Sequence, residues 1–366
     1  MILMNDFKAE PAALRDAMAL ATRRVIDSGW YVLGKEVQAF ERLWAECCGV
    51  AHGLGVGNGM DAIEIALRAL GVGPGDEVIT TPMTAFATVL AILRAGATPV
   101  LADIDPGSAL LGFDSVQRCV TPRTRALLLV HLYGQVRQMD TWLALCAQAG
   151  IALVEDCAQA HLACSGQRVA GSMGRAGAYS FYPTKNLGAL GDAGMLVTND
   201  AGLARSAAQL RNYGQSERYH HPYLGMNSRL DEMQAALLAE RQRWLSEFTE
   251  RRKHIGATYL AAIRNPLVSM MDPPESHGAH VYHLFVVGSP QRDRLQAHLQ
   301  DKNIQALIHY PVPVHHQAPC LDIRRDPLGL LHTERHAREC LSLPCHPQLS
   351  DADLEQVIAA VNSFGV

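Results

Sequence analysis

One lysine, Lys185, stands between a serine, Ser180, and two glycines, Gly188 and Gly191, in the segment of residues 180–192. A lysine amine can form a Schiff base with an aldehyde, and a serine hydroxyl can bind a phosphate. The segment is therefore suited to presenting an amine to a phosphorylated aldehyde. Most lysines are solvated surface charges, so Lys185 becomes a catalytic candidate only if other segments supply the remaining parts of such a site.

Two adjacent carboxylates, Glu155 and Asp156, follow the apolar residues 151–154, which are typical of a buried strand. A carboxylate beside a pyridine nitrogen raises the pKa of that nitrogen, and the protonated ring then accepts electrons from a substrate carbanion. A helix cap or a buried salt bridge is the alternative explanation for a single aspartate. The residues by themselves leave open which of the two carboxylates has which role.

A glycine-rich turn at residues 55–62 precedes a helical pattern with apolar residues at Ile65, Ala66 and Ala69. Glycines let the backbone approach an anion, and the free N–H groups of a helix start favour a phosphate there. The turn has neither the dinucleotide-binding G-x-G-x-x-G spacing nor the Gly-Lys-Ser/Thr ending of a P-loop. It is a candidate phosphate site, with an ordinary tight turn as the alternative.

The elements that position these residues alternate between short apolar runs and longer helical patterns from about residue 50 to residue 200. The apolar runs are residues 77–80, 99–102, 126–130, 151–154 and 194–197. Runs that are apolar throughout indicate strands buried on both faces, so we predict an α/β fold with a mostly parallel central sheet sandwiched by helices. Ligands bind such sheets at the carboxyl ends of the strands.

A second, smaller domain is expected after a long helix that follows Asn227. Ser228 is a candidate cap of this helix, and Leu230, Met233 and Leu237 lie along one stripe of it. We predict a large domain over residues 1–245 and a small C-terminal α+β domain over residues 246–366. The small domain should contain a strand at 282–287, a helix at 292–300 and a rigid loop at 309–313.

Composition excludes several classes of function. The chain has 366 residues, of which 48% are hydrophobic and 19% charged, and its net charge of -4 gives no basic surface for nucleic acid. Nine cysteines without a C-x-x-C pair signal neither a disulfide framework nor a zinc site. The absence of an apolar run of about 18 residues argues against a membrane segment. We expect a cytoplasmic enzyme.

A metal site is not expected from the histidines. His315 and His316, together with His309, could suggest a metal, but no paired carboxylate or cysteine spacing accompanies them. Neighbouring histidines in a loop are more simply explained as polar side chains. We therefore predict no metal.

Taken together, these segments resemble the DegT/StrS-type sugar aminotransferases, a branch of the fold-type-I pyridoxal-phosphate enzymes. The resemblance spans nearly the whole chain in ordered blocks. The blocks include residues 73–79, 130–135, 155–161, 180–192, 227–236, 309–311 and 341–344. It implies a homodimer with shared active sites and pyridoxal 5'-phosphate as the cofactor.

The resemblance also implies a role for each matching residue. Lys185 matches the Schiff-base lysine and Asp156 matches the partner of the pyridine nitrogen. The other expected cofactor contacts are Gln159 at the ring oxygen, Ser180, Gly59 and Met60 at the phosphate, and Asn227 reaching the phosphate from the neighbouring subunit. Arg229, His309 and Tyr310 match positions near the nucleotide-sugar.

Two positions depart from the family's pattern. Met60 stands where relatives commonly carry threonine or another small residue, so backbone donors would hold more of the phosphate. Relatives usually place the aromatic residue that stacks on the cofactor ring at the position of Ala85, whereas here Phe86 is the nearest aromatic. Phe86 either stacks from a shifted position or belongs to the core.

The implied reaction is transamination of a ketone on a nucleotide-linked sugar, with L-glutamate as the amino donor. The ending Gly191-Asp192 resembles relatives that act at C-3, which makes a dTDP-linked 3-keto-6-deoxyhexose the leading acceptor. The alternatives are C-4 or UDP-linked keto-sugars, a cyclitol ketone and a non-catalytic regulatory relative. Relatives that dehydrate sugars typically replace the lysine with histidine, and Lys185 argues against that class.

Overall fold

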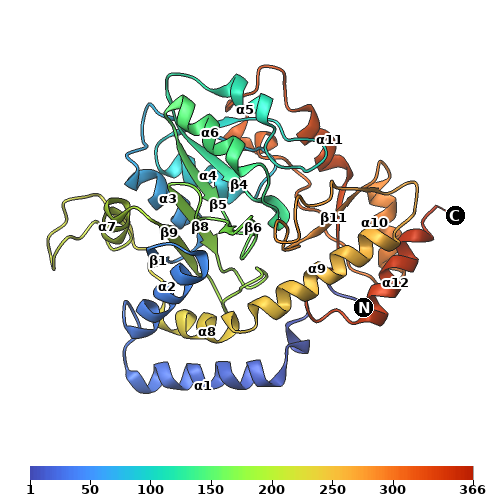
Figure 1. Ribbon diagram of the computed structural model, residues 1–366, viewed down its shortest axis with the longest axis horizontal. Coiled ribbons are helices and arrows are strands. Elements are labelled where there is room, and N and C mark those ends of the chain that lie inside the picture. Colours follow the sequence, from blue (N-terminus) through green and yellow to red (C-terminus); the bar gives the residue numbers. More distant parts are fainter. Residues whose placement is uncertain (366) are drawn as a thin grey trace.

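A twisted sheet of eight strands forms the centre of the computed structural model, which describes residues 1–365 (Figure 1). In spatial order the strands are β1 (His52–Val56), β9 (Gly194–Thr198), β8 (Ala176–Ser180), β5 (Ala152–Asp156), β4 (Thr124–Val130), β2 (Glu77–Thr80), β3 (Thr98–Leu101) and β12 (Arg324–Arg325). Only β9 runs against its neighbours. The predicted mostly parallel sheet is confirmed.

All five predicted apolar runs are strands, but three strands of the central sheet were not predicted. One is the two-residue β12, and the other two are β1, with the sequence HGLGV, and β8, with the sequence AGAYS. Their glycines and alanines do not form a run of large apolar side chains, so the sequence pattern hides them. Both matter for the site, because β1 leads into the glycine-rich turn and β8 ends at Ser180.

Helices cover both faces of the sheet. The helices of this part are α1 (Ala12–Ser28), α2 (Lys35–Cys48), α3 (Gly59–Ala69), α4 (Phe86–Arg94), α5 (Phe113–Cys119), α6 (Met139–Ala149), α7 (Ala201–Leu210) and α8 (Glu232–Gln242). One buried cluster includes Trp44 of α2 and Trp142 of α6, and the cluster on the opposite face includes Ile65 of α3 and Ile92 of α4. Strands apolar on both faces therefore have a core on each side.

The C-terminal part has its own apolar core around a three-stranded antiparallel sheet. The strands are β10 (Ser269–Met270), β11 (Phe285–Gly288) and β13 (Cys340–Leu343), and the helices are α9 (Leu245–Ala262), α10 (Arg292–Asp301), α11 (Leu331–Glu339) and α12 (Asp351–Asn362). Ile255 and Tyr259 of α9 pack into this core. The predicted boundary at residue 245 falls at the start of α9, and the division into two domains remains a prediction.

The short elements are a β-hairpin and four turns of 3-10 helix. They are β6 (Cys164–Ser165), β7 (Arg168–Val169), η1 (Phe7–Ala9), η2 (Leu132–Gly134), η3 (Val314–His316) and η4 (Ala318–Cys320). The predicted helix at 292–300 is confirmed by α10. The predicted strand at 282–287 begins only at Phe285, because Tyr282 has a φ of 46°, which is incompatible with a strand. In residues 1–365, no helix combines the length and apolar character that a membrane crossing requires.

The predicted capping role of Ser228 is wrong. Helix α8 begins only at Glu232, and the Ser228 hydroxyl instead accepts the Gly57 N–H at 3.0 Å. The predicted single helix is also divided, since α8 ends at Gln242 and α9 begins at Leu245. Ser228 therefore ties the start of this segment to the glycine-rich turn.

A buried carboxylate fixes the start of α2. Glu232, 2% exposed, accepts the N–H groups of Gly34 at 2.8 Å, Glu36 at 2.9 Å and Val37 at 3.0 Å. These groups have no partner inside their own helix, and the positive end of the helix dipole favours a carboxylate there. Glu232 thereby holds α2 against α8, and α1 lies along α8 at the lower edge of Figure 1.

We expect Glu232→Ala to lower the free energy of unfolding by about 3 kcal/mol, because it leaves one buried and two half-buried N–H groups without an acceptor. Urea denaturation measures this loss. The matched control is Glu36→Ala, which removes only the partly exposed ion pair with Arg24 and should cost less than about 1 kcal/mol. Equal losses in the two variants would contradict this role of Glu232.

Candidate active site

The glycine-rich turn brings the start of α3 against the end of β8. Asn58 caps α3 by accepting the Asp61 N–H at 2.8 Å, and the N–H groups of Gly59 and Met60 lie in the first turn, before any acceptor within the helix. A Cβ on Gly59 would lie 2.7 Å from the Ser180 Cβ, so only glycine allows this approach. Gly59, Met60 and Ser180, predicted to bind the phosphate, are thus brought together.

The side chain of Met60 is directed into the apolar core beside α3, where it packs against the cluster that includes Ile65. Only the backbone of Met60 is then available at the helix start. This agrees with the expectation that backbone donors replace the hydroxyl that relatives commonly supply at this position.

Asp156 is the last residue of β5 and is almost completely buried. Its Oδ2 accepts the Thr88 hydroxyl at 2.9 Å, and its Oδ1 accepts the Ala158 N–H at 3.1 Å. Burial raises the pKa of Asp156, against the opposing effects of these two hydrogen bonds and of the Lys185 charge. A carboxylate in this environment gains from a cationic partner.

Glu155 has a different role, which the sequence could not separate from that of Asp156. Successive residues of a strand point to opposite faces, and the Glu155 carboxylate accepts the N–H groups of Gly171, Met173 and Gly174 at 2.7 to 2.8 Å. His131 Nε2 lies 2.9 Å from its Oε2. Glu155 therefore anchors the segment between β7 and β8, and Asp156 remains the candidate for the cofactor.

Lys185 lies half-buried in the loop between β8 and β9. The loop turns tightly, with the Lys185 N–H donating to the Tyr182 carbonyl at 2.8 Å. A Cβ on Gly188 would lie 2.2 Å from the Pro183 carbonyl oxygen, which explains a glycine there. Burial lowers the pKa of Lys185 from 10.5 to about 8, although the negative charge of Asp156 opposes this change.

Gln159 and Tyr310 are in contact. The Gln159 amide donates to the Tyr310 hydroxyl at 3.2 Å, and its oxygen accepts the Tyr133 N–H at 2.5 Å. Burial, helped by the Asp156 charge, raises the pKa of Tyr310 to about 12. Its hydroxyl therefore stays protonated at neutral pH.

His309 lies on the C-terminal side of the same region. Its Nδ1 lies 2.8 Å from the Ser342 hydroxyl of β13, and its carbonyl accepts the Tyr133 hydroxyl at 2.6 Å. Burial, followed by the charge of Lys185, lowers the pKa of His309 to about 4. The imidazole is consequently neutral at physiological pH.

Asn227 and Arg229 flank Ser228, whose hydroxyl contacts the glycine-rich turn. Asn227 is exposed and forms a bridge with Asn212, while Arg229 reaches the Asn212 amide oxygen at 3.3 Å and the Tyr213 ring, whose centroid lies 5.2 Å from its Cζ. Within residues 1–365, neither side chain forms a hydrogen bond with Lys185. Their predicted roles remain predictions that a single chain does not test.

Phe86 is the first residue of α4 and packs against a small apolar cluster that includes Val89, Val314 and Cys320. This contact supports the core alternative for Phe86. The hydroxyl of Thr88 contacts Asp156, and the sequence did not predict this contact because the two residues lie 68 positions apart in the chain. His131 and Tyr133 were also missed, although both belong to a block that carried the resemblance.

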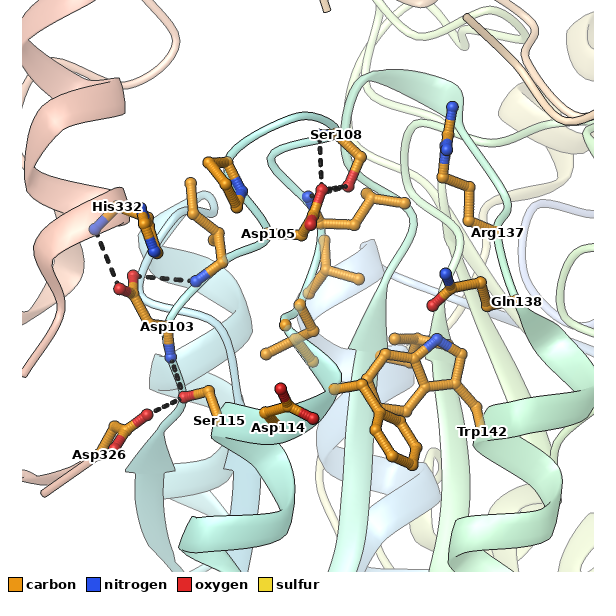
Figure 2. A pocket seen from close by; sticks show the side chains of 18 of the residues that line it. Asp103, Asp105, Ser108, Asp114, Ser115, Arg137, Gln138, Trp142, Asp326 and His332 are labelled. Carbon is orange, nitrogen blue, oxygen red and sulfur yellow. Dashed lines mark hydrogen bonds between the residues drawn. The ribbon is translucent and has the colours of Figure 1, made fainter. Parts of the chain in front are cut away.

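A cavity of about 550 Å³ opens elsewhere on the molecule, between α5, α6 and the start of α11 (Figure 2). Asp103 accepts the N–H groups of His332 and Thr333, and Ser115 donates to Asp326. These carboxylates already have protein partners. None of the predicted site residues lines the cavity.

The sheet, the buried Asp156 at the end of β5 and the half-buried Lys185 after the neighbouring strand β8 define a fold-type-I pyridoxal-phosphate enzyme. The sequence pattern of the DegT/DnrJ/EryC1/StrS aminotransferase family matches residues 13–362, and the chain belongs to this family. The predicted resemblance, enzyme class and cofactor are confirmed.

Known proteins resemble the chain over its full length. The dTDP-3-amino-3,6-dideoxy-alpha-D-galactopyranose transaminase of Aneurinibacillus thermoaerophilus is 43% identical over 100% of both chains. The pleiotropic regulatory protein of Geobacillus stearothermophilus is 40% identical over 99% of this chain and 98% of its own. The crystal structure of S. venezuelae DesV in complex with a ketimine intermediate has a TM-score of 0.95 and 42% identity, covering 99% of this chain and 98% of that chain.

The residues of this chain fit pyridoxal phosphate. The free N–H groups at the start of α3 lie beside Ser180, which suits an anion, and Asp156 is a buried carboxylate suited to a protonated ring nitrogen. Lys185 is the amine whose lowered pKa suits Schiff-base formation. A phosphate group, a ring nitrogen and an aldehyde therefore each have a matching residue.

The lowered pKa of Lys185 predicts the pH at which its amine becomes reactive. In cofactor-free enzyme, competitive acylation followed by peptide mass analysis should show half-maximal labelling of Lys185 near pH 8. The exposed Lys35 provides an internal comparison. Because the unfolded chain keeps this proton up to about pH 10.5, the group should also make the folded state more stable as the pH rises from 8 to 10.5. A labelling midpoint near 10.5 would contradict the effect of burial.

Proposed function

We propose that this aminotransferase transfers an amino group from L-glutamate to the ketone of a nucleotide-linked sugar. The observation that carries the proposal is the pairing of Asp156 and Lys185 beside the anion site at Gly59 and Ser180. The transaminase from A. thermoaerophilus, with a nucleotide-linked amino sugar in its name, supports the class of acceptor.

In the proposed reaction, some side chains of the protein transfer protons and others orient the reacting groups. When bound, pyridoxal phosphate would supply the electron sink for the carbanion formed at the donor Cα. Asp156 would hold the proton on the ring nitrogen, and Thr88 and the Ala158 N–H fix the orientation of its carboxylate. The Lys185 amine takes the Cα proton of the donor and, in the second half-reaction, moves the proton at the sugar carbon that receives nitrogen.

Gln159, Tyr310 and His309 would form the wall beside these groups. Gln159 is fixed at both ends, by Tyr133 and by Tyr310, so its amide can orient a ring oxygen with little loss of entropy. His309 is neutral and keeps its Nε2 available, because Nδ1 is the ring atom that lies beside Ser342. It is therefore suited to a hydroxyl of the sugar rather than to an anionic phosphate.

The position on the sugar is proposed to be C-3, with a dTDP-linked 3-keto-6-deoxyhexose as the leading acceptor. The loop that carries Lys185 continues to Gly191 and Asp192, and the Leu190 N–H donates to Gln234 of α8 at 2.9 Å. This contact fixes the end of the loop whose residues suggest C-3. The name of the A. thermoaerophilus relative also refers to a 3-amino sugar. C-4 ketones, UDP-linked sugars and cyclitol ketones remain the alternatives.

Incubation with L-glutamate and a panel of dTDP- and UDP-linked 3-keto and 4-keto sugars tests this function. We expect glutamate to convert the cofactor to its pyridoxamine form and the dTDP-linked 3-keto sugar to gain an amine, which mass spectrometry detects and NMR locates at C-3. Lys185→Ala should abolish both changes. Glutamate-dependent conversion without amination of any nucleotide sugar would contradict the acceptor class and leave the aminotransferase class intact.

A regulatory function without catalysis is the second candidate, and the name of the G. stearothermophilus relative is its support. The same chain, however, keeps a buried Asp156 and a Lys185 with its pKa lowered to about 8. Maintaining these desolvated groups costs stability, so their presence together favours a catalytic site. Failure of the glutamate reaction in enzyme that binds the cofactor would favour the regulatory candidate.

We further propose that the active unit is a homodimer in which Asn227 reaches the cofactor phosphate of the partner. Its exposure and the exposed aromatic side chains nearby, Tyr213, Tyr219 and Tyr223, support an interface in this region. In Figure 1 the segment after α7 projects away from the sheet.

Asn227→Ala should weaken cofactor affinity about tenfold while the thermal midpoint of the cofactor-free enzyme stays unchanged, because the side chain is exposed within one chain. Fluorescence titration with pyridoxal phosphate measures the affinity. The control is His220→Ala, which changes an exposed residue of the same segment and should leave the cofactor affinity unchanged. Unchanged affinity in Asn227→Ala would contradict the shared site.

A further inference from the structure

Three potential metal ligands meet at a place that the proposed reaction does not use. His315 and His316 lie in η3, and Glu334 lies in α11, nearly twenty residues along the chain. One ligand atom from each side chain lies within 4.8 Å of the other two. The fold thus supplies the carboxylate whose absence from the local sequence argued against a metal, while His309 lies elsewhere, beside Ser342.

His315 is the observation that points to a ligand. It is 1% exposed, yet neither of its ring nitrogens has a hydrogen-bond partner of normal geometry within residues 1–365. Buried polar groups without partners are rare in folded proteins and call for a physical explanation. Its Nε2 lies 3.4 Å from Glu334 Oε1, which is longer than a normal hydrogen bond.

The spacing suits two ligands of one small cation. Zinc binds imidazole nitrogen and carboxylate oxygen at about 2.0 to 2.2 Å, so two ligands at a tetrahedral angle lie about 3.4 Å apart. The separation of His315 Nε2 and Glu334 Oε1 has this value.

We propose that His315, His316 and Glu334 form a binding site for a divalent transition-metal ion of the zinc class. A site with two imidazoles and one carboxylate binds such ions in preference to Mg²⁺ or Ca²⁺, which favour oxygen ligands. His316 is exposed and the Glu334 side chain is 36% exposed, so solvent can reach the fourth position and the ion can enter. This site goes beyond the proposed function and does not depend on it.

The ion would join η3 to α11 at the end of the loop that carries His309 and Tyr310. Two residues beyond Glu334, His336 Nε2 lies 2.9 Å from the Tyr133 hydroxyl, which donates to the His309 carbonyl. Helix α11 would then hold both ends of this loop, one through Tyr133 and the other through the metal. The role assigned to the ion is therefore structural.

Zinc binding by the full-length, chelator-treated protein tests the proposal, with isothermal titration calorimetry as the measurement. We expect one site per chain, with affinity reduced at least about tenfold in His316→Ala and in Glu334→Gln. His332→Ala removes an exposed histidine of the same helix and should leave the affinity unchanged. Both ligand variants change side chains outside the core, so they should fold even if His315→Ala does not.

Cobalt substitution gives a second readout, because the intensity of the visible Co²⁺ bands distinguishes four from six ligands. We expect the strong bands of a four-coordinate ion in the wild type and their loss in Glu334→Gln. Zinc should also raise the melting temperature of the wild type in a concentration-dependent way and have less effect on both variants. Absence of a stoichiometric site, or equal zinc affinity in the wild type and both ligand variants, would overturn the proposal.

Discussion

The interaction on which the site depends is the electrostatic coupling between a buried carboxylate and a half-buried amine. Burial acts on both in the direction that favours the uncharged form, raising the pKa of Asp156 and lowering that of Lys185 to about 8. The two charges also stabilise each other. A protonated pyridine ring would complete this arrangement by giving Asp156 a cationic partner and leaving Lys185 free to exchange its proton.

The surrounding structure serves to hold this pair in place. Strand β5 delivers two carboxylates to opposite faces, and Glu155 uses its face to anchor backbone N–H groups while Asp156 faces the site. The absence of a side chain at Gly59 lets α3 approach Ser180, so the free N–H groups of the helix start meet this serine where β1 and β8 end. Glu232 fixes α2 in the same way, through backbone N–H groups at a helix start.

The fold could be predicted from the sequence where strands contain large apolar side chains, and less well where small residues and backbone contacts determine the structure. Strands β1 and β8 were not predicted because they are rich in glycine and alanine, although the close approach of Gly59 to Ser180 depends on both strands. Ser228 was assigned to the wrong partner because its hydroxyl binds an N–H from far along the chain. Contacts between residues so far apart in the chain cannot be recognised from the neighbouring sequence.

The candidate site shows the same division. The motif residues could be named from the sequence, since Lys185, Asp156 and Gln159 follow strands or occupy a glycine-bearing loop. The residues that orient them, Thr88 and Tyr133, act through contacts that only the folded chain brings about. The meeting of Glu334 with His315 likewise required the packing of α11 against η3.

The central claim is that Lys185 is the amine that binds the cofactor covalently. Borohydride reduction of the cofactor-loaded enzyme, followed by peptide mass mapping, tests it most directly. We predict that the reduced cofactor is found on the peptide that contains Lys185 and that Lys185→Ala retains no covalent label. Label on a different lysine, or enzyme that binds the cofactor and acquires no label, would contradict the account.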